Sequence, residues 1–384
     1  MSIQTAGRLA DRVSMASASS SHPDAGTAVA ELAGALGDTA PLFAVFVTPG
    51  YDLDATAAAI QTWCGGRVIA CTSSGNIGPD GYAKAGMIAV SFSGGGLRAR
   101  TIPVGSTDVS QAVEQVSVDL SELHAMWEDS DGFAVLLVDG LTRREDRLAA
   151  ALMAALGDVP IIGGSAGDGL TFTRTAVLCD GHFVDDGATL TMVTLDTPFR
   201  LFRLQHHEPS DIILVATDAT PDQRLVRALN GRTAAEAYAE AVGLSIDALD
   251  PVVFSTHPLI LLAAGQSWVR SISAVNPDGS LSMFAAVQPG DALRLGRPVG
   301  MIEKLEARFA DVTADLGRLS GVLAFDCVLR RLEFEERGID TRIGRLLAEK
   351  GAVGFSTYGE QFNGMHMNQT LVAVAFGAGS DPAN

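Results

Sequence analysis

The sequence has few positive charges for its size. Its 384 residues include 27 lysines and arginines against 45 aspartates and glutamates, which gives a formal net charge of −18. A chain this acidic lacks the basic surface that holds nucleic acid or anionic lipid, unless a local patch supplies it. The composition therefore argues against a nucleic-acid-binding protein and against a peripheral membrane protein.

Cysteines at the spacing of a C-x-x-C motif are also absent. The four cysteines, Cys64, Cys71, Cys179 and Cys327, form no C-x-x-C motif, so zinc ribbons, thioredoxin-like redox sites and covalently attached c-type haem have no support. We expect these cysteines to be small buried side chains in a reducing compartment. For Cys327 two interpretations stay open, a buried thiol and a reactive thiol.

Long apolar runs are missing as well. The longest, such as residues 258–264, are far shorter than a membrane span. The first residues show no basic region followed by an apolar run, so we expect no signal peptide. These absences predict a soluble cytoplasmic protein. The small polar residues 14–21 predict that residues 1–30 form a loose N-terminal arm.

Glycine is abundant, with 41 residues, while aromatic residues make up only 6% of the chain and hydrophobic residues 47%. This combination favours an α/β protein with many tight turns. The length predicts two or three domains.

A repeated pattern runs through the first half of the chain, where Phe133 stands 90 residues after Phe43. Each copy has a buried strand, a helix, a second buried strand, a Ser/Gly loop and further strands. In the first copy these lie at 43–47, 53–63, 68–71, 72–78 and 86–92, and in the second at 133–138, 147–156, 160–163, 164–169, 175–179 and 188–195. We therefore predict a duplicated β-α-β unit with added antiparallel strands, whose loops 73–78 and 165–169 lie at equivalent strand ends.

The second half has a looser pattern. Strands are expected at 259–264, 268–275 and 281–287, and a helix at 305–319. A third copy of the repeated pattern follows, with segments 322–327, 343–349, 353–358 and 371–376. The fold expected is therefore two linked α/β domains, residues 31–220 and residues 221–384.

The segment Gly163–Gly167 matches the G-x-S-x-G pattern of serine hydrolases, in which a nucleophilic serine stands between a strand and a helix. Here residues 168–173 lead into residues typical of strands, not of a helix. Glycines that let the backbone approach closely, or that offer N–H groups to an anion, are the better interpretation. A serine hydrolase at Ser165 remains a remote alternative.

Three segments carry a family resemblance: residues 162–168 with Asp180-Gly181, residues 268–272, and residues 354–370. Together they resemble the FIST family, and in particular its bacterial haem-based nitric-oxide-sensing branch. The resemblance covers nearly everything after residue 30. It implies linked FIST N and FIST C domains and a stand-alone sensor that regulates a separate histidine kinase or cyclic-di-GMP enzyme by protein contact. The chain itself has no kinase, cyclase or DNA-binding signature.

The resemblance also implies haem b as cofactor, and noncovalent haem needs an axial ligand in an apolar pocket. His366 is our first candidate for the iron ligand, with Met365 and Met367 beside it as apolar cofactor-binding residues, although a structural or general ligand-binding histidine stays open there. The pair His206 and His207, near the domain boundary, is the second candidate. The cationic partners expected for the haem propionates are Arg270, Arg330 and Arg331.

A sensor without haem is the alternative. It would bind a small polar metabolite, such as an amino acid, through the glycine loops and the segment that follows residue 357. The ligand-binding residues expected in that case are Gly164, Ser165, Tyr358, Glu360 and Asn368.

Overall fold

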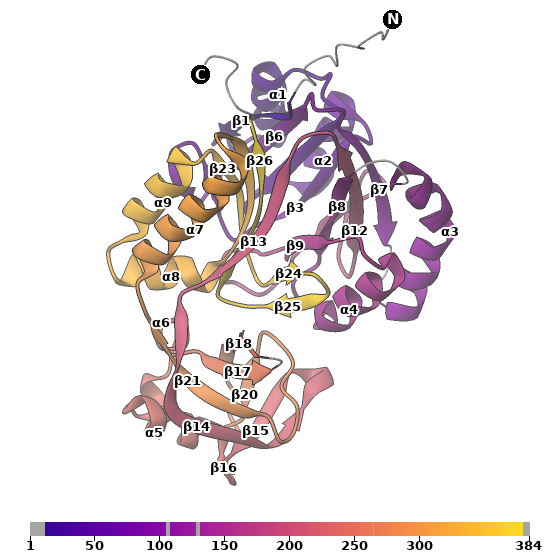
Figure 1. Ribbon diagram of the computed structural model, residues 1–384. Coiled ribbons are helices and arrows are strands. Elements are labelled where there is room, and N and C mark those ends of the chain that lie inside the picture. The colour runs from indigo at the N-terminus through magenta and orange to yellow at the C-terminus, as the bar shows by residue number, and fades with distance from the viewer. Residues whose placement is uncertain (1–11, 105–107, 128–130, 264, 379–384) are drawn as a thin grey trace, which may run out of the picture.

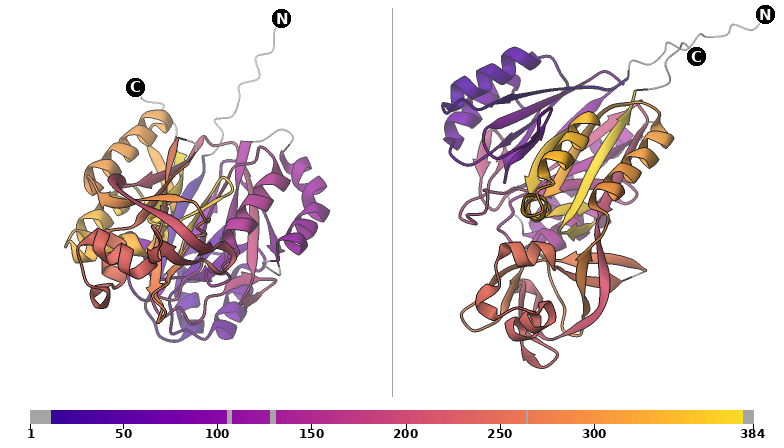
Figure 2. Two further views of the ribbon diagram at one scale, coloured as in Figure 1. Left: turned by 90° about the horizontal axis from the view of Figure 1, so that it is seen from below. Right: turned by 90° about the vertical axis from the view of Figure 1, so that its left-hand side faces the viewer.

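The computed structural model describes residues 12–104, 108–127, 131–263 and 265–378. These residues form a mixed α/β fold, as the sequence predicted. A large body contains three six-stranded sheets, and a smaller unit with an eight-stranded sheet is attached to its lower end (Figure 1). Figure 2 shows the same two parts from below and from the side.

The body is built from one structural module that occurs three times. Module 1 contains β1 (Ser14–Ser20), α1 (Ala25–Leu36), β2 (Leu42–Val47), α2 (Leu53–Cys64), β3 (Val68–Thr72), β4 (Asn76–Gly78), β5 (Gly81–Ala83) and β6 (Met87–Ser93). Module 2 contains β7 (Arg98–Val104), α3 (Val109–Trp127), β8 (Asp131–Val138), α4 (Glu145–Leu156), β9 (Ile161–Ser165), β10 (Val177–Cys179), β11 (His182–Val184) and β12 (Ala188–Leu195).

Module 3 follows the same order but is interrupted after its first strand. It contains β13 (Phe199–Gln205), α7 (Met301–Leu316), β22 (Leu319–Cys327), α8 (Val328–Glu336), α9 (Asp340–Glu349), β23 (Ala352–Thr357), β24 (Glu360–Phe362), β25 (Met365–Met367) and β26 (Thr370–Gly377). Residues 206–300, here called the insertion, form the smaller unit. Its elements are β14 (His207–Thr220), β15 (Leu225–Leu229), β16 (Arg232–Thr233), α5 (Ala234–Val242), α6 (Pro251–Thr256), β17 (Leu259–Ala263), β18 (Gln266–Arg270), β19 (Ile272–Val275), β20 (Leu281–Met283) and β21 (Ala292–Pro298), with short 3-10 turns at Pro221–Gln223 and Ile246–Ala248.

The modules are linked in a ring by exchanged hairpins. Within each module two strands run parallel: β2 with β3, β8 with β9, and β22 with β23. The hairpin that follows the second of these strands joins the sheet of another module. Hairpin β4–β5 pairs with β23, hairpin β10–β11 with β3, and hairpin β24–β25 with β9.

This exchange brings the ends of β3, β9 and β23 together at the centre of the ring. Ser74 N donates to Ser356 O, Gly167 N to Thr72 O, and Tyr358 N to Ser165 O. The loops after β3 and β9 therefore lie at equivalent ends of matching strands, as the repeat predicted.

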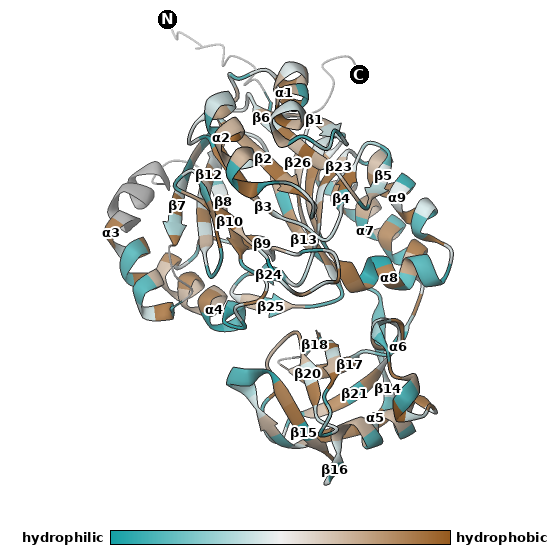
Figure 3. Ribbon diagram, turned by 180° about the vertical axis from the view of Figure 1, so that it is seen from behind, coloured by the Kyte–Doolittle hydropathy of each residue, from teal (hydrophilic) through white to brown (hydrophobic). Residues whose placement is uncertain are grey.

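The core explains why these strands are apolar on both faces. The inner faces of all three sheets share one cluster, in which Phe46 stacks on Phe355 with ring centroids 4.5 Å apart. The outer faces are covered by α1 and α2, by α3 and α4, and by α7 and α9. Figure 3 shows the result, with mostly hydrophobic strands inside the body and hydrophilic positions on the helices. A strand that is covered on both faces is a continuous apolar run in the sequence, and for this reason these strands could be predicted.

Two expectations differ from the structure. The loose arm expected over residues 1–30 is wrong for its described part, because β1 pairs antiparallel with β6 and α1 packs on the sheet; residues 1–11 lie outside the described residues. The expected second domain, 221–384, is not one spatial unit either. Residues 301–377 return to the body, where β26 pairs with β13 of the first half.

No helix of the described residues is long and apolar enough to span a membrane.

Candidate functional site

The carboxyl ends of the parallel strands give one candidate region in each module, here called cleft 1, cleft 2 and cleft 3, because open α/β sheets place their ligands there. Cleft 1 lies between the β2–α2 loop and residues 168–174 of module 2. Cleft 2 lies between the start of α4 and hairpin β24–β25. Cleft 3 lies between the end of β22 and hairpin β4–β5. The three clefts are equivalent by the repeat, but they are filled differently.

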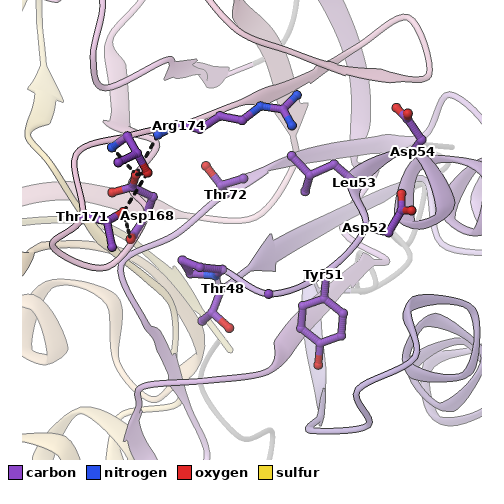
Figure 4. Close-up of a pocket in the computed structure, with 12 residues that line it drawn as sticks. Thr48, Tyr51, Asp52, Leu53, Asp54, Thr72, Asp168, Thr171 and Arg174 are labelled. Atoms are coloured by element: carbon purple, nitrogen blue, oxygen red, sulfur yellow. Dashed lines mark hydrogen bonds between the residues drawn. The ribbon is translucent and has the colours of Figure 1, made fainter.

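Cleft 1 is open. Its cavity of about 420 Å³ is lined by the loop from Thr48 to Asp54, by Thr72, and by Asp168, Thr171, Thr173 and Arg174 (Figure 4). Asp168 accepts hydrogen bonds from the Tyr358 hydroxyl and from backbone N–H groups of its own loop. Burial raises the pKa of Asp168, but these hydrogen bonds outweigh it and lower that pKa to about 2. The carboxylate is thus committed to holding the loop.

Cleft 3 is filled by protein side chains. Arg330 Nε donates to Asp326 Oδ1 at 2.6 Å, and Arg331 Nη1 donates to Ser74 O at 2.6 Å. Both arginines lie on α8 and are buried. The expectation that they bind haem propionates is therefore wrong in this structure, because their donors hold the centre of the fold together. Cys327, at the end of β22, is buried, and burial raises the pKa of its thiol. The interpretation of Cys327 as a reactive cysteine is therefore wrong too.

Cleft 2 is closed by the insertion. Arg224, beside β15, donates to Glu145 Oε2 and to Asp146 Oδ2, both at 2.6 Å, at the start of α4. Phe284, after β20, offers its carbonyl oxygen to the ring of His366, with 3.3 Å between O and Nε2. Parts of modules 2 and 3 and of the insertion therefore meet in one buried, charged site.

His366 connects this site to Ser165. Its Nδ1 lies 3.1 Å from Gln361 Nε2, which also donates to Ser165 Oγ at 2.9 Å. Because an amide nitrogen only donates, His366 Nδ1 accepts, and its Nε2 carries the proton toward Phe284 O. Burial lowers the pKa of His366, so the ring is neutral at pH 7. Ser165 has an amide and not a base as its partner, which is not the contact of a nucleophile with its activating group.

Arg270 is a buried charged side chain of cleft 2 that has no ion-pair partner in the part of the chain that the structure describes. Its side chain is only 7% exposed, its Nη1 donates only to the neighbouring Val269 O, and its Nε has no hydrogen-bond partner. Among the described residues no carboxylate lies within ion-pair distance of it, and Asp146 and Asp291 act from farther away. Burial lowers the pKa of Arg270, opposed by those two carboxylates. A buried guanidinium is costly without an anion.

Further polar atoms around Arg270 lack partners. β18, which ends at Arg270, contacts β25, which carries His366. The buried side-chain atoms without a hydrogen bond in this region are Ser271 Oγ, Gln361 Oε1 and Arg224 Nε. Native interiors leave few such atoms, so these three, together with Arg270, make cleft 2 our candidate ligand site.

The remaining expected residues surround cleft 2 or lie behind it. Tyr358 separates clefts 1 and 2, with its ring stacked 4.7 Å from that of Phe172, and Asn368 Nδ2 donates to Tyr358 O at 3.4 Å. Gly164 and Glu360 pair backbone to backbone behind the site, and Glu360 accepts hydrogen bonds from two threonines. Met367 lies in the central core, and Met365 packs at its edge.

His206 and His207 are not part of cleft 2. They stand where β13 passes into β14, and both rings face Glu333 of α8. Sequence reasoning therefore grouped residues of two separate sites. It missed Arg224, Glu145, Asp146 and Gln361, whose charges and amide give no local pattern.

Neither His366 nor His206 has a free ring nitrogen for haem iron in this arrangement. Both ring nitrogens of His366 have protein partners, and a Cβ on Gly359 would collide with that ring. Both ring nitrogens of His206 are held as well, by Glu333 and Arg330. The open cavity of cleft 1 contains no histidine, cysteine or methionine for the iron.

Comparison with known families gives two adjacent matches. Residues 41–232 match the FIST N domain, and residues 234–363 match the FIST C domain. No curated protein matches the chain. The two matches meet at residue 233, inside the insertion, and not at the expected residue 220.

Proposed function

Since the chain belongs to the FIST family, whose domains are sensory domains of signal transduction, we propose that it senses a small anionic or zwitterionic molecule bound in cleft 2. The observation that carries this proposal is Arg270, a buried guanidinium with an unpartnered Nε and no neighbouring carboxylate in ion-pair contact. A ligand carboxylate supplies the missing anion through paired hydrogen bonds.

The other charges of cleft 2 favour a zwitterion, such as a free amino acid. Asp146 keeps part of its side chain exposed, and it already attracts both Arg224 and Arg270. Its carboxylate can accept the ligand's ammonium group, while Ser271 Oγ and Gln361 Oε1 provide neutral hydrogen bonds.

The position of the ligand in cleft 2 suggests how binding would be converted into a signal. A molecule held between Arg270 of the insertion and Asp146 of module 2 changes how tightly the insertion is bound to the body. Neither matched domain is a signalling enzyme, so we expect another protein to respond to this difference. A histidine kinase or a cyclic-di-GMP enzyme is the partner we propose.

The test is ligand binding by the full chain. We expect one or more free amino acids to raise the melting temperature, and calorimetry to give a single site. Arg270→Gln removes charge-assisted hydrogen bonds worth about 1.5–3 kcal/mol, so the dissociation constant should rise roughly 10- to 150-fold. Arg232→Gln, an exposed arginine of the same insertion, is the matched control and should bind normally.

Haem with nitric oxide as signal is the alternative ligand, and it gives a different result. It requires a Soret band that shifts with nitric oxide and is lost in His366→Ala. A protein that stays colourless when grown with haem, and whose amino-acid binding depends on Arg270, supports our proposal. Unchanged amino-acid binding in Arg270→Gln would contradict it.

A further inference from the structure

The insertion is joined to the body by two chain segments that run side by side. On the way out β13 passes through His206 and His207 into β14, and on the way back β21 ends at Pro298. His207 pairs with Pro298, and Val299 N donates to His206 O at 2.9 Å. This junction is separate from cleft 2.

A group of metal-ligand type stands at this junction. The Nε2 atoms of His206 and His207 lie 2.8 Å and 3.2 Å from the same atom, Oε2 of Glu333. The three atoms lie within 4.8 Å of one another, and all three residues are buried. Glu333 is fixed from the other side by Arg337, whose Nε lies 3.1 Å from Oε1.

His207 provides a second, independent observation. Its side chain is fully buried, yet neither ring nitrogen makes a hydrogen bond, although Nε2 lies 3.2 Å from Glu333 Oε2. A buried imidazole without a partner is unfavourable unless something coordinates it. A cation between the two rings and Glu333 would satisfy His207 and keep the charge of Glu333 balanced.

We propose that His206, His207 and Glu333 bind a divalent metal ion of the zinc type at the junction between the insertion and the body. Two neutral imidazoles and one carboxylate are ligands that zinc prefers, and three protein ligands leave a fourth position for water or another group. A tetrahedral ion about 2.0–2.2 Å from each ligand needs its ligand atoms about 3.3 Å apart. The separation of His207 Nε2 from Glu333 Oε2, 3.2 Å, is close to that value, while the 2.8 Å separation of His206 Nε2 must widen by about 0.5 Å when the ion binds.

Arg330 determines what must move when the ion binds. Its Nη1 lies 2.8 Å from His206 Nδ1, and a guanidinium only donates, so in this structure the ring proton of His206 is on Nε2. An ion at Nε2 requires that proton to shift to Nδ1, and Arg330 Nη1 must then turn away. Its Nε can remain on Asp326 during this change. Metal binding is therefore coupled to the α8 side chains that fill cleft 3.

The experiment uses the full chain, purified without a polyhistidine tag and stripped with chelator. Titration with Co²⁺ should give visible bands of a four-coordinate ion with one equivalent bound, and Zn²⁺ should displace it. His207→Gln should weaken Co²⁺ binding at least about tenfold, while the control His182→Gln, on strand β11, binds as the wild type does.

Two results would overturn the proposal: no stoichiometric binding by the wild type, or equal affinity in His207→Gln and the wild type. Circular dichroism checks the fold of each variant. If His207→Gln does not fold, X-ray absorption of the wild-type Co²⁺ complex decides, since two imidazoles and a carboxylate are expected. A spectrum without imidazole ligands contradicts the site. Amino-acid binding at Arg270 is measured separately, so each proposal can fail alone.

Discussion

At the scale of single residues, packing and not backbone conformation requires the glycine before Ser165. A Cβ on Gly164 would lie 2.6 Å from Thr357 Cγ2 and 3.1 Å from ring atoms of Phe325 and Phe355. These neighbours come from β22 and β23 of module 3, so the glycine allows two sheets to approach closely.

This contact gives the first prediction. Gly164→Val should lower the free energy of unfolding by about 1–3 kcal/mol through overpacking. Ser165→Ala should cost about 1 kcal/mol, because it loses one hydrogen bond while the Gln361 amide keeps His366 as a neighbour. Urea unfolding of both variants measures the two values. A larger loss for Ser165→Ala than for Gly164→Val would contradict this ranking.

Glu360 gives a prediction about pH. Burial raises its pKa from 4.5 to about 8, although hydrogen bonds from Thr357 and Thr370 oppose the shift. The folded protein therefore keeps this proton where the unfolded chain has lost it. The contribution to stability is complete below pH 4.5 and is lost as the pH rises toward about 8.

Glu360→Gln, which resembles the protonated form, isolates this contribution. The melting temperature of the variant should be near that of the wild type at pH 5 and exceed it by about 2 °C or more at pH 8.5. Melting curves of both proteins across this range are the measurement. A difference between variant and wild type that does not change with pH would mean that Glu360 is ionised in the fold.

At the scale of elements, the exchanged hairpins decide how the modules are joined. Hairpin β24–β25 turns at Asn363 and Gly364, whose φ angles are 47° and 79°. Positive φ at both central residues is typical of the tight turns of two-residue hairpins. The equivalent hairpin β10–β11 turns in the same way at Asp180 and Gly181.

Comparing these two turns separates strain from packing. Gly181→Ala adds a Cβ at positive φ with its nearest neighbour at 3.6 Å, so only backbone strain of about 1–2 kcal/mol is expected. Gly364→Ala adds the same strain and a contact of 2.9 Å with Met153 Cβ of α4, so it should cost more. Chemical unfolding of both variants is the measurement. Equal losses would show that α4 adapts to the extra methyl group.

At the scale of the whole molecule, the insertion is built as an addition to a complete three-module ring. It has its own core, around residues such as Tyr238, Phe254 and Leu293. The two ends of the insertion are already adjacent, because Val299 N donates to His206 O.

We therefore predict that the body folds without the insertion. Replacing residues 207–298 by a short Gly/Ser linker should leave a protein with cooperative thermal unfolding, while amino-acid binding is lost because Arg224 and Arg270 are removed. Circular dichroism and calorimetry test both parts. An unfolded product would mean that the contacts of α6 with α8 are needed for the body.

The candidate site could be predicted only in part. His366, Ser165, Tyr358, Asn368 and Arg270 were found because they stand in segments with a family resemblance or with glycine patterns. Arg224 and its partners were not, since Glu145 and Asp146 lie 79 and 78 positions before Arg224 in the chain. Charged residues that come together only after folding do not alter the local hydrophobic periodicity of the sequence.

The sequence by itself determined the parallel strands and helices of the repeat, because a strand buried on both faces must be apolar throughout, whichever partner it meets. β12 was located to the residue for this reason. The tertiary structure alone decided the rest. The edge strand β1 is polar and held by backbone hydrogen bonds, and the hairpins pair with another module's sheet, so neither has a local signature. The insertion closes cleft 2 through contacts between distant residues, and for that reason only the folded chain shows that Arg270 is buried without an anion.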